Sequence, residues 1–231
     1  MPKTFKIITI LFMFVSMPYC AYAQFIDMSL GIRGGLSLAS YSRDVDFGST
    51  LLDESLSSNN IERVTGGVVF SGKLSPIIGF NVEGMFVNKG GSVDASTFSS
   101  ANLTPVNRNY RSDLNYLQFS LIPKIVLDQT PVFGFFGDIG VYTAFLTSAK
   151  EEVRESTFQQ ERLLGRDISG SISGTDFGMI FMGGVNLSSI SLEARYSLGF
   201  TNIVKDPSIS SHVKAKNNVI SFLIGYNFAL L

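Results

Sequence analysis

The sequence predicts an all-β protein, folded as an eight-stranded antiparallel up-and-down transmembrane β-barrel. Three observations lead to this fold class. Apolar residues alternate with small or polar residues along eight segments, which is the period of a β-strand. The connections between the segments are short and long in turn, as in a series of hairpins. The composition, with 22 Gly, 20 Phe and only 16% charged residues, suits β-structure whose apolar face does not contact water.

The composition also excludes several classes of protein. With 45% hydrophobic residues and a net charge of −1, the chain is too apolar to be disordered. Its 18 Lys and Arg are matched by 19 Asp and Glu, so it lacks the basic surplus of a nucleic-acid binder, and we expect no nucleic-acid partner. No apolar run reaches the length of about 18 residues that a transmembrane helix needs.

Residues 1–23 have the pattern of a secretory signal peptide. Lys3 and Lys6 give it a positive start, residues 7–15 are apolar, and Ala21-Tyr22-Ala23 is a small-x-small cleavage site. The mature chain would then begin at residue 24, which leaves residues 24–231 for an outer-membrane β-barrel domain.

The single cysteine, Cys20, precedes this cleavage site. A lipoprotein acylation site there is the alternative, but Met17-Pro18-Tyr19 lacks the small residues that such a motif has next to its cysteine. With cleavage after Ala23, the mature chain has no cysteine for a disulfide, a nucleophile or a metal.

The eight alternating segments place bulky apolar residues on one face and small or polar residues on the other. The last one is the clearest: Ile220, Phe222 and Ile224 alternate with Ser221, Leu223 and Gly225. Strand side chains point to opposite faces in turn, so each segment has an apolar row and a polar row. In chain order the segments, with the charges on their polar rows, cover residues 28–40 (Arg33), 64–74 (Lys73), 78–89 (Glu83 and Lys89), 115–127 (Lys124), 132–147 (Asp138), 176–187 (Asp176), 190–200 (Glu193 and Arg195) and 220–230.

The connections alternate in length. Turns of two to four residues occur at Ser75-Pro76, at residues 128–131 and at Ser188-Ser189, and they require antiparallel neighbours. Three short turns on one side put both termini on that side. A weak helical turn is possible within residues 151–164. The four long connections, rich in Ser, Asn and Thr, are residues 41–63, 90–114, 148–174 and 202–217.

The apolar row decides which solvent surrounds the barrel. Eight rows of Phe, Leu and Ile would overfill a small barrel, whereas a row of Gly and Ser fits inside it. The bulky row must therefore face outwards, where only lipid accepts a continuous apolar surface. About ten residues per strand, tilted by about 40°, cover roughly 25 Å, the height of an outer-membrane apolar band. A soluble ligand-binding barrel, apolar inside and polar outside, is the alternative.

The polar row then places four positive and four negative charges in the lumen. Buried charges are tolerated when they are paired, so we expect a compensated polar core that fills the lumen and leaves no pore. These structural lumen charges are Arg33, Lys73, Lys124, Arg195, Glu83, Asp138, Asp176 and Glu193.

Several segments resemble the outer-membrane β-barrel family of Bacteroidetes that is often called PorT-like: residues 31–37, 116–124, 137–150, 191–199 and 217–228. The resemblance implies a Gram-negative outer membrane and a closed barrel, and little about activity. The family takes its name from a member connected with protein secretion.

Many outer-membrane barrels end on an aromatic residue that the barrel-assembly machinery recognises. Here Tyr226 and Phe228 are the nearest candidates for that contact.

The residues suggest no catalytic, cofactor or metal site. The single histidine, His212, lies beside Ser210 and Ser211 with Asp206 nearby, but adjacent residues rarely achieve the geometry of a nucleophile and its base. One histidine and no mature cysteine make a zinc site improbable. Glu193 and Arg195 share one face and could be proton-active, although a structural ion pair is the simpler interpretation.

We therefore expect a non-enzymatic outer-membrane barrel with a structural or interaction role at the cell surface. Its termini would lie in the periplasm, and its four long loops (residues 41–63, 90–114, 148–174 and 202–217) would meet an unknown protein partner outside. One alternative is an accessory factor for protein secretion, which a deletion that leaves export intact would contradict. The other is a lipid-modifying or hydrolytic barrel enzyme that uses His212.

Overall fold

The computed structural model describes residues 27–45, 58–75, 77–98, 105–125, 133–156, 161–205 and 213–230. The predicted signal peptide with Cys20 lies outside the described residues, as do His212 and its neighbours Asp206, Ser210 and Ser211. Across the described ranges, no helix is both long and apolar enough to cross a membrane.

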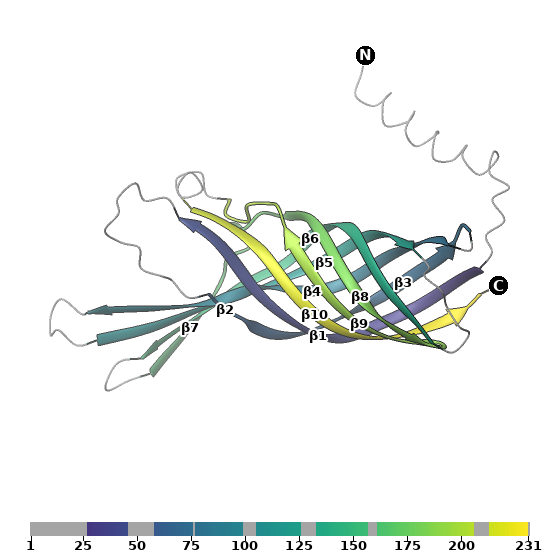
Figure 1. Cartoon of the computed structure of the whole chain (residues 1–231). Coiled ribbons are helices and arrows are strands. Elements are labelled where there is room, and N and C mark those ends of the chain that lie inside the picture. Colours follow the sequence, from purple (N-terminus) through teal and green to yellow (C-terminus); the bar gives the residue numbers. More distant parts are fainter. Residues whose placement is uncertain are drawn as a thin grey trace, which may run out of the picture.

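In the described residues, ten antiparallel strands form one sheet, and eight of them close into a ring (Figure 1). Each ring strand pairs with the next along the chain, and β10 pairs with β1 from Ser29↔Ala229 to Val45↔Val213. The predicted eight-stranded up-and-down barrel is confirmed, and closure leaves the ring without an edge. The strands are β1 (Asp27–Val45), β2 (Ser58–Asn59), β3 (Ile61–Lys73), β4 (Ile78–Phe98), β5 (Pro105–Ile125), β6 (Phe133–Ser156), β7 (Glu161–Asp167), β8 (Thr175–Leu187), β9 (Ile190–Gly199) and β10 (Val213–Ala229), with β2 and β7 outside the ring.

The start of β1, the end of β10 and the turns that follow β3 and β8 lie at one end of the barrel, which we call the terminal end (Figure 1). The predicted turn at residues 128–131 lies outside the described residues. Ser188 and Ser189 form a two-residue turn between β8 and β9, with Ser188 in the left-handed region at φ 56°. Tight hairpins need such positive φ values because the turn must follow the twist of the strands. Between β3 and β4, the Ser75 hydroxyl accepts hydrogen bonds from the backbone N–H groups of Ile77 and Ile78.

The apolar rows face outwards and the polar rows face the lumen. Phe222 is 55% exposed and Leu192 is 42% exposed, whereas Arg195, three residues after Leu192 on β9, is 6% exposed. The Gly- and Ser-rich rows fit inside, and the bulky rows surround the barrel, as the alternation predicts. A soluble barrel with an apolar interior would have the opposite arrangement, so that alternative is wrong.

The outer apolar band ends at a row of polar side chains on three neighbouring strands. On β4, Phe86 is the last large apolar side chain of the outward row, and Asn88 follows it. The Asn88 amide donates to Asn115 on β5 (2.7 Å), and the Asn115 amide donates to the hydroxyl of Ser148 on β6 (2.9 Å). This row marks the boundary of the apolar wall at the end opposite the termini, which we call the hairpin end.

Much of two predicted loops is strand, and this corrects the sequence interpretation. Within residues 90–114, β4 and β5 stay paired from Gly90↔Asp113 to Phe98↔Pro105. Within residues 148–174, β6 continues to Ser156 and pairs with β7. These extensions project beyond the barrel (Figure 1). Both faces of the projecting sheet are outside the apolar band, so its strands have no alternating pattern to reveal them.

The helical turn expected within residues 151–164 is wrong. The described part of this segment belongs to β6 and β7, where Glu151 and Arg166 are cross-strand partners joined by an ion pair of 2.7 Å. Pairing with the preceding strand satisfies the backbone donors and acceptors that a single helical turn would leave open. Opposite charges on facing strands add to that pairing.

Candidate functional site

A buried chain of alternating charges crosses the lumen. The Arg33 Nε on β1 donates to Glu193 Oε1 on β9 at 2.6 Å. The other Glu193 oxygen accepts from Arg195 Nε at 3.0 Å, and Arg195 Nη2 donates to Glu83 Oε1 on β4 at 2.8 Å. Each of the four residues is at most 7% exposed. Because β4 and β9 occupy opposite positions in the ring, the Glu83–Arg195 pair joins opposite walls of the barrel.

Two glycines leave room for Arg33 beside this network. A Cβ atom at Gly225 would overlap the Ser191 hydroxyl and would lie 2.5 Å from Arg33 Nη1. That hydroxyl donates to Glu193 (2.8 Å), and Arg33 Nη1 donates to Asn227 (2.9 Å). At Gly31 a Cβ would similarly meet Arg33 Nη1 at 2.7 Å. The polar rows are therefore rich in glycine where long charged side chains cross the lumen.

Gly225→Ala is expected to destabilise the barrel by about 1–3 kcal/mol, because the added methyl group would displace Arg33 from its ion pair. Gly34→Ala is the matched control: a Cβ atom there has nothing within 4 Å, so its effect should stay within about 0.5 kcal/mol. Urea unfolding of both variants in the same lipid vesicles measures the difference. Equal stabilities would contradict the crowding of Arg33.

A second buried pair lies nearer the hairpin end. The Lys89 ammonium donates to Asp176 at 2.9 Å, and both side chains are fully buried. The Tyr142 hydroxyl (3.3 Å) and the Asn217 amide (3.1 Å) donate to the same carboxylate oxygen. Lys89 also lies 4.0 Å from the centroid of the Tyr142 ring, within the range of a cation–π contact. This site joins β4, β6, β8 and β10.

Lys89 is absent from the predicted lumen charges, although the alternation places it on the polar row. It lies on the polar row of residues 78–89, three positions along that row from Glu83. Lys73, which was predicted in the lumen, lies at the rim of the terminal end, where its half-exposed ammonium pairs with Asp27 at 2.7 Å. With Lys89 in its place, the charged residues along the lumen include Arg33, Lys89, Lys124 and Arg195 together with Glu83, Asp138, Asp176 and Glu193.

Lys124 and Asp138 are the two predicted charges outside both networks. Asp138 is 4% exposed, and neither carboxylate oxygen has a hydrogen-bond partner among the described residues. Lys124 is half-buried, and its ammonium lies 5.3 Å from the centroid of the Phe136 ring. The structure thus brings together Arg33, Glu83, Glu193 and Arg195 and pairs Asp176 with Lys89. Lys124 and Asp138 lie outside both networks, and each is the leading opposite charge that acts on the other.

An apolar cluster fills the lumen at the hairpin end. Ile203, 2% exposed, packs with buried ring residues such as Leu114, Tyr142 and Ala215. Backbone hydrogen bonds hold it there: Ser173 N–H donates to Ile203 O, and Ile203 N–H donates to Ala215 O. A bridge between Ile172 and Val204 ties the two connecting segments together. Side chains of these connections therefore cover the Lys89–Asp176 pair.

The chemistry of these groups is that of fixed ion pairs. Glu193 is bonded to two guanidinium groups and Arg195 to two carboxylates, so neither is free to exchange a proton with a substrate. In the part of the chain that the structure describes, no group of three or more His, Cys, Asp or Glu residues is placed to hold a metal ion.

Several solved outer-membrane proteins are similar to this chain. OprG of Pseudomonas aeruginosa shares 13% identity, with 88% of this chain and 97% of that chain covered and a TM-score of 0.46. Neisserial surface protein A shares 13% identity over 86% and 97% of the two chains, with a TM-score of 0.41. Ail, the attachment invasion locus protein of Yersinia pestis, shares 12% identity over 88% and 100%, with a TM-score of 0.38. A comparison with curated proteins finds no match.

The family is shown by the sequence itself. Residues 22–205 of the 231 match the family described as "Outer membrane protein beta-barrel domain". The match covers the strands from β1 to β9, and it agrees with a closed barrel that is apolar outside and polar inside. This chain belongs to the outer membrane protein beta-barrel domain family, whose place is the outer membrane.

Proposed function

We propose that this protein is a non-enzymatic barrel that anchors a projecting β-sheet at the cell surface, where the sheet contacts a partner. The observation that carries the proposal is the continuation of β4, β5 and β6 beyond the apolar band, joined there by β2 and β7. A filled lumen, crossed by ion pairs, supports a role as a rigid support.

One face of the projecting sheet is strongly charged. Cross-strand partners Arg111↔Glu152 and Asp113↔Lys150 pair opposite charges across β5 and β6. Asp113 also receives a hydrogen bond from Arg63 on β3. Ion pairs of this kind keep the sheet in water and suit the recognition of a polar partner. The partner would meet the hairpins within residues 90–114 and 148–174, with residues 41–63 and 202–217 beside them.

The proposed orientation places both termini in the periplasm and the hairpin end outside the cell. With a signal peptide cleaved after Ala23, the mature chain is free of cysteine, and a single cysteine can report its side of the membrane. Gly165→Cys, exposed and with open space around its Cβ position, should react with a membrane-impermeant maleimide on intact cells. Ser188→Cys in the terminal-end turn should react only after the envelope is opened.

Both variants carry Cys20→Ser, so that an uncleaved leader cannot be labelled. Protease added to whole cells should likewise cut within residues 148–174 and spare Ser188-Ser189. Labelling of Ser188→Cys, but not Gly165→Cys, on intact cells would reverse the orientation and remove the surface role.

The proposal of a non-enzymatic role is tested at His212, the one histidine of the chain. His212→Ala should leave the lipid profile and the growth of the host unchanged, because the adjacent Ser211 and His212 rarely achieve the geometry of a nucleophile and its base. A changed lipid profile, restored by the wild-type chain, would instead support the lipid-modifying enzyme.

A more specific membership, in the PorT-like group of Bacteroidetes, is supported by the resemblance of residues 191–199 and 217–228. On this view an accessory role in protein secretion is the second candidate. The projecting sheet suits it equally, because an accessory factor also needs a binding surface. The barrel-assembly machinery and outer-membrane lipid are the remaining partners that we propose.

A further inference from the structure

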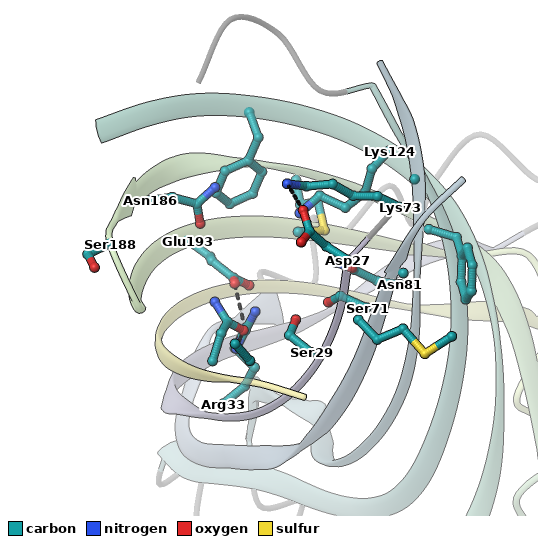
Figure 2. Close-up of a pocket in the computed structure, with 18 residues that line it drawn as sticks. Asp27, Ser29, Arg33, Ser71, Lys73, Asn81, Lys124, Asn186, Ser188 and Glu193 are labelled. Atoms are coloured by element: carbon teal, nitrogen blue, oxygen red, sulfur yellow. Dashed lines mark hydrogen bonds and ion pairs between the residues drawn. The ribbon is translucent and has the colours of Figure 1, made fainter. Parts of the chain in front are cut away.

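A cavity of about 250 Å³ lies inside the barrel at the terminal end (Figure 2). All eight ring strands contribute to its lining, so it is the mouth of the lumen rather than a gap between two strands. The half-exposed pair of Lys73 and Asp27 lies at its rim, and the Arg33–Glu193 pair lines its wall. Neither network of the lumen fills this space.

The charges around this cavity are balanced. The pair at the rim and the pair in the wall each consist of one cation and one carboxylate. The third cation of the lining is Lys124, and the leading opposite charge that acts on it is Asp138. A charged ligand would therefore bring a charge without a partner into the lumen, which is costly. The cavity suits a neutral ligand.

One wall of the cavity carries a row of neutral polar side chains (Figure 2). Ser29 on β1 is the cross-strand partner of Ser71 on β3, and Ser71 is the partner of Asn81 on β4. Asn81 is 2% exposed, and its side-chain oxygen has no hydrogen-bond partner among the described residues. A buried acceptor without a donor costs free energy. A ligand that donates a hydrogen bond to Asn81 would remove that cost.

The facing wall has an apolar part. Phe136 on β6 and Met182 on β8 line it, and both are buried. In the order of the ring, β6 and β8 stand opposite β1 and β3, so the Phe136 and Met182 side chains face the row of serines. Water against such groups is poorly bonded, and an apolar group that displaces it gains affinity. A ligand with hydroxyl groups on one edge and C–H groups on one face would match both walls.

We propose that this cavity binds a small neutral sugar. Its hydroxyl groups would bond to Ser29, Ser71 and Asn81, and one face of its ring would lie against Phe136. Asn186, in the same lining, offers a further amide. The cavity is smaller than the roughly 300 Å³ at which pockets for drug-sized ligands begin, which limits the ligand to about one sugar ring. The site lies at the end of the barrel away from the projecting sheet and goes beyond the surface role.

The test is a titration of the full chain in phosphocholine micelles, a detergent without sugar, with the asparagine side-chain amides labelled with ¹⁵N and observed by NMR. Glucose, galactose and N-acetylglucosamine are added in separate arms, with sodium acetate as a charged reference. The Asn81 amide signal, assigned by its loss in Asn81→Leu, should move and saturate in at least one sugar arm. Saturation with acetate at a concentration no higher than with any sugar would overturn the proposal. So would the absence of saturation in all three sugar arms, which would leave water alone in the cavity.

Asn59 on β2 is the internal control, because it is exposed and its amide is held by Asp94 at 2.7 Å. An Asn81 signal that moves only in step with that of Asn59 would contradict a specific site. By calorimetry, Asn81→Leu should weaken binding of the same sugar by about twofold to tenfold, the usual value of one neutral hydrogen bond. Asn59→Leu should bind as the wild type does, and equal affinities of the two variants would overturn the role of Asn81. Since the titration uses the unmodified chain, the proposal stays testable if Asn81→Leu does not fold.

Discussion

Arg195→Met is expected to destabilise the folded barrel by about 3–5 kcal/mol, the usual cost of removing one partner of a buried ion pair. The guanidinium of Arg195 is bonded to Glu83 and Glu193, and all three side chains are buried. Its removal leaves the Glu83 carboxylate without a cation, whereas Glu193 keeps Arg33. Methionine fills similar space, so the loss measures the charge and not a cavity. Urea unfolding in lipid vesicles, followed by gel mobility, gives the free energy.

The matched control is Arg166→Met, which removes an arginine from an ion pair with Glu151 on the projecting sheet. The Arg166 side chain is 71% exposed, and such surface pairs contribute at most about 1 kcal/mol. Combining Arg195→Met with Glu83→Gln should recover part of the loss, because the unpaired carboxylate is then gone. A cost for Arg195→Met no larger than that for Arg166→Met would show that water reaches Glu83 and that the lumen is not filled.

Much of the barrel could be predicted from the sequence because lipid and the narrow lumen impose opposite demands on alternate residues. The rows Ile220, Phe222, Ile224 and Ser221, Leu223, Gly225 follow directly from this constraint. It acts only within the apolar band. Beyond Asn88 and Ser148 the outer face no longer contacts lipid, so alternation is no longer required. The continuation of β4, β5 and β6 therefore leaves no signal in the pattern.

Which lumen charges pair with one another could not be predicted from the sequence, and the reason is geometric. Alternation says which side chains point inwards, but not how far along the axis each lies or which wall it faces. Glu83 meets Arg195 because β4 and β9 stand on opposite sides of the ring, and that depends on the number and tilt of the strands. Lys73 points inwards too, yet it lies so near the strand end that it reaches the rim and Asp27.

Ile224→Arg is expected to cost about 2–4 kcal/mol, the penalty for a cation at the middle of the bilayer on the outer wall of a barrel. Ile224 is 63% exposed and lies at the centre of the outward apolar run of β10, which extends from Ile220 to Phe228. Arginine has ample room there, so steric strain contributes little. Reversible unfolding in lipid vesicles measures the cost.

Ile220→Arg and Phe228→Arg are the controls, because they add the same charge at the two ends of the run. Near the interfaces, where the guanidinium reaches water, the cost falls to about 0–1 kcal/mol. A free-energy cost that is high at Ile224 and low at both ends would show that the outer wall of β10 crosses the hydrocarbon layer with Ile224 near its middle. Equal costs at all three positions would show that this face does not cross the bilayer as the apolar band requires, since a uniform solvent cannot distinguish the middle of a strand from its ends.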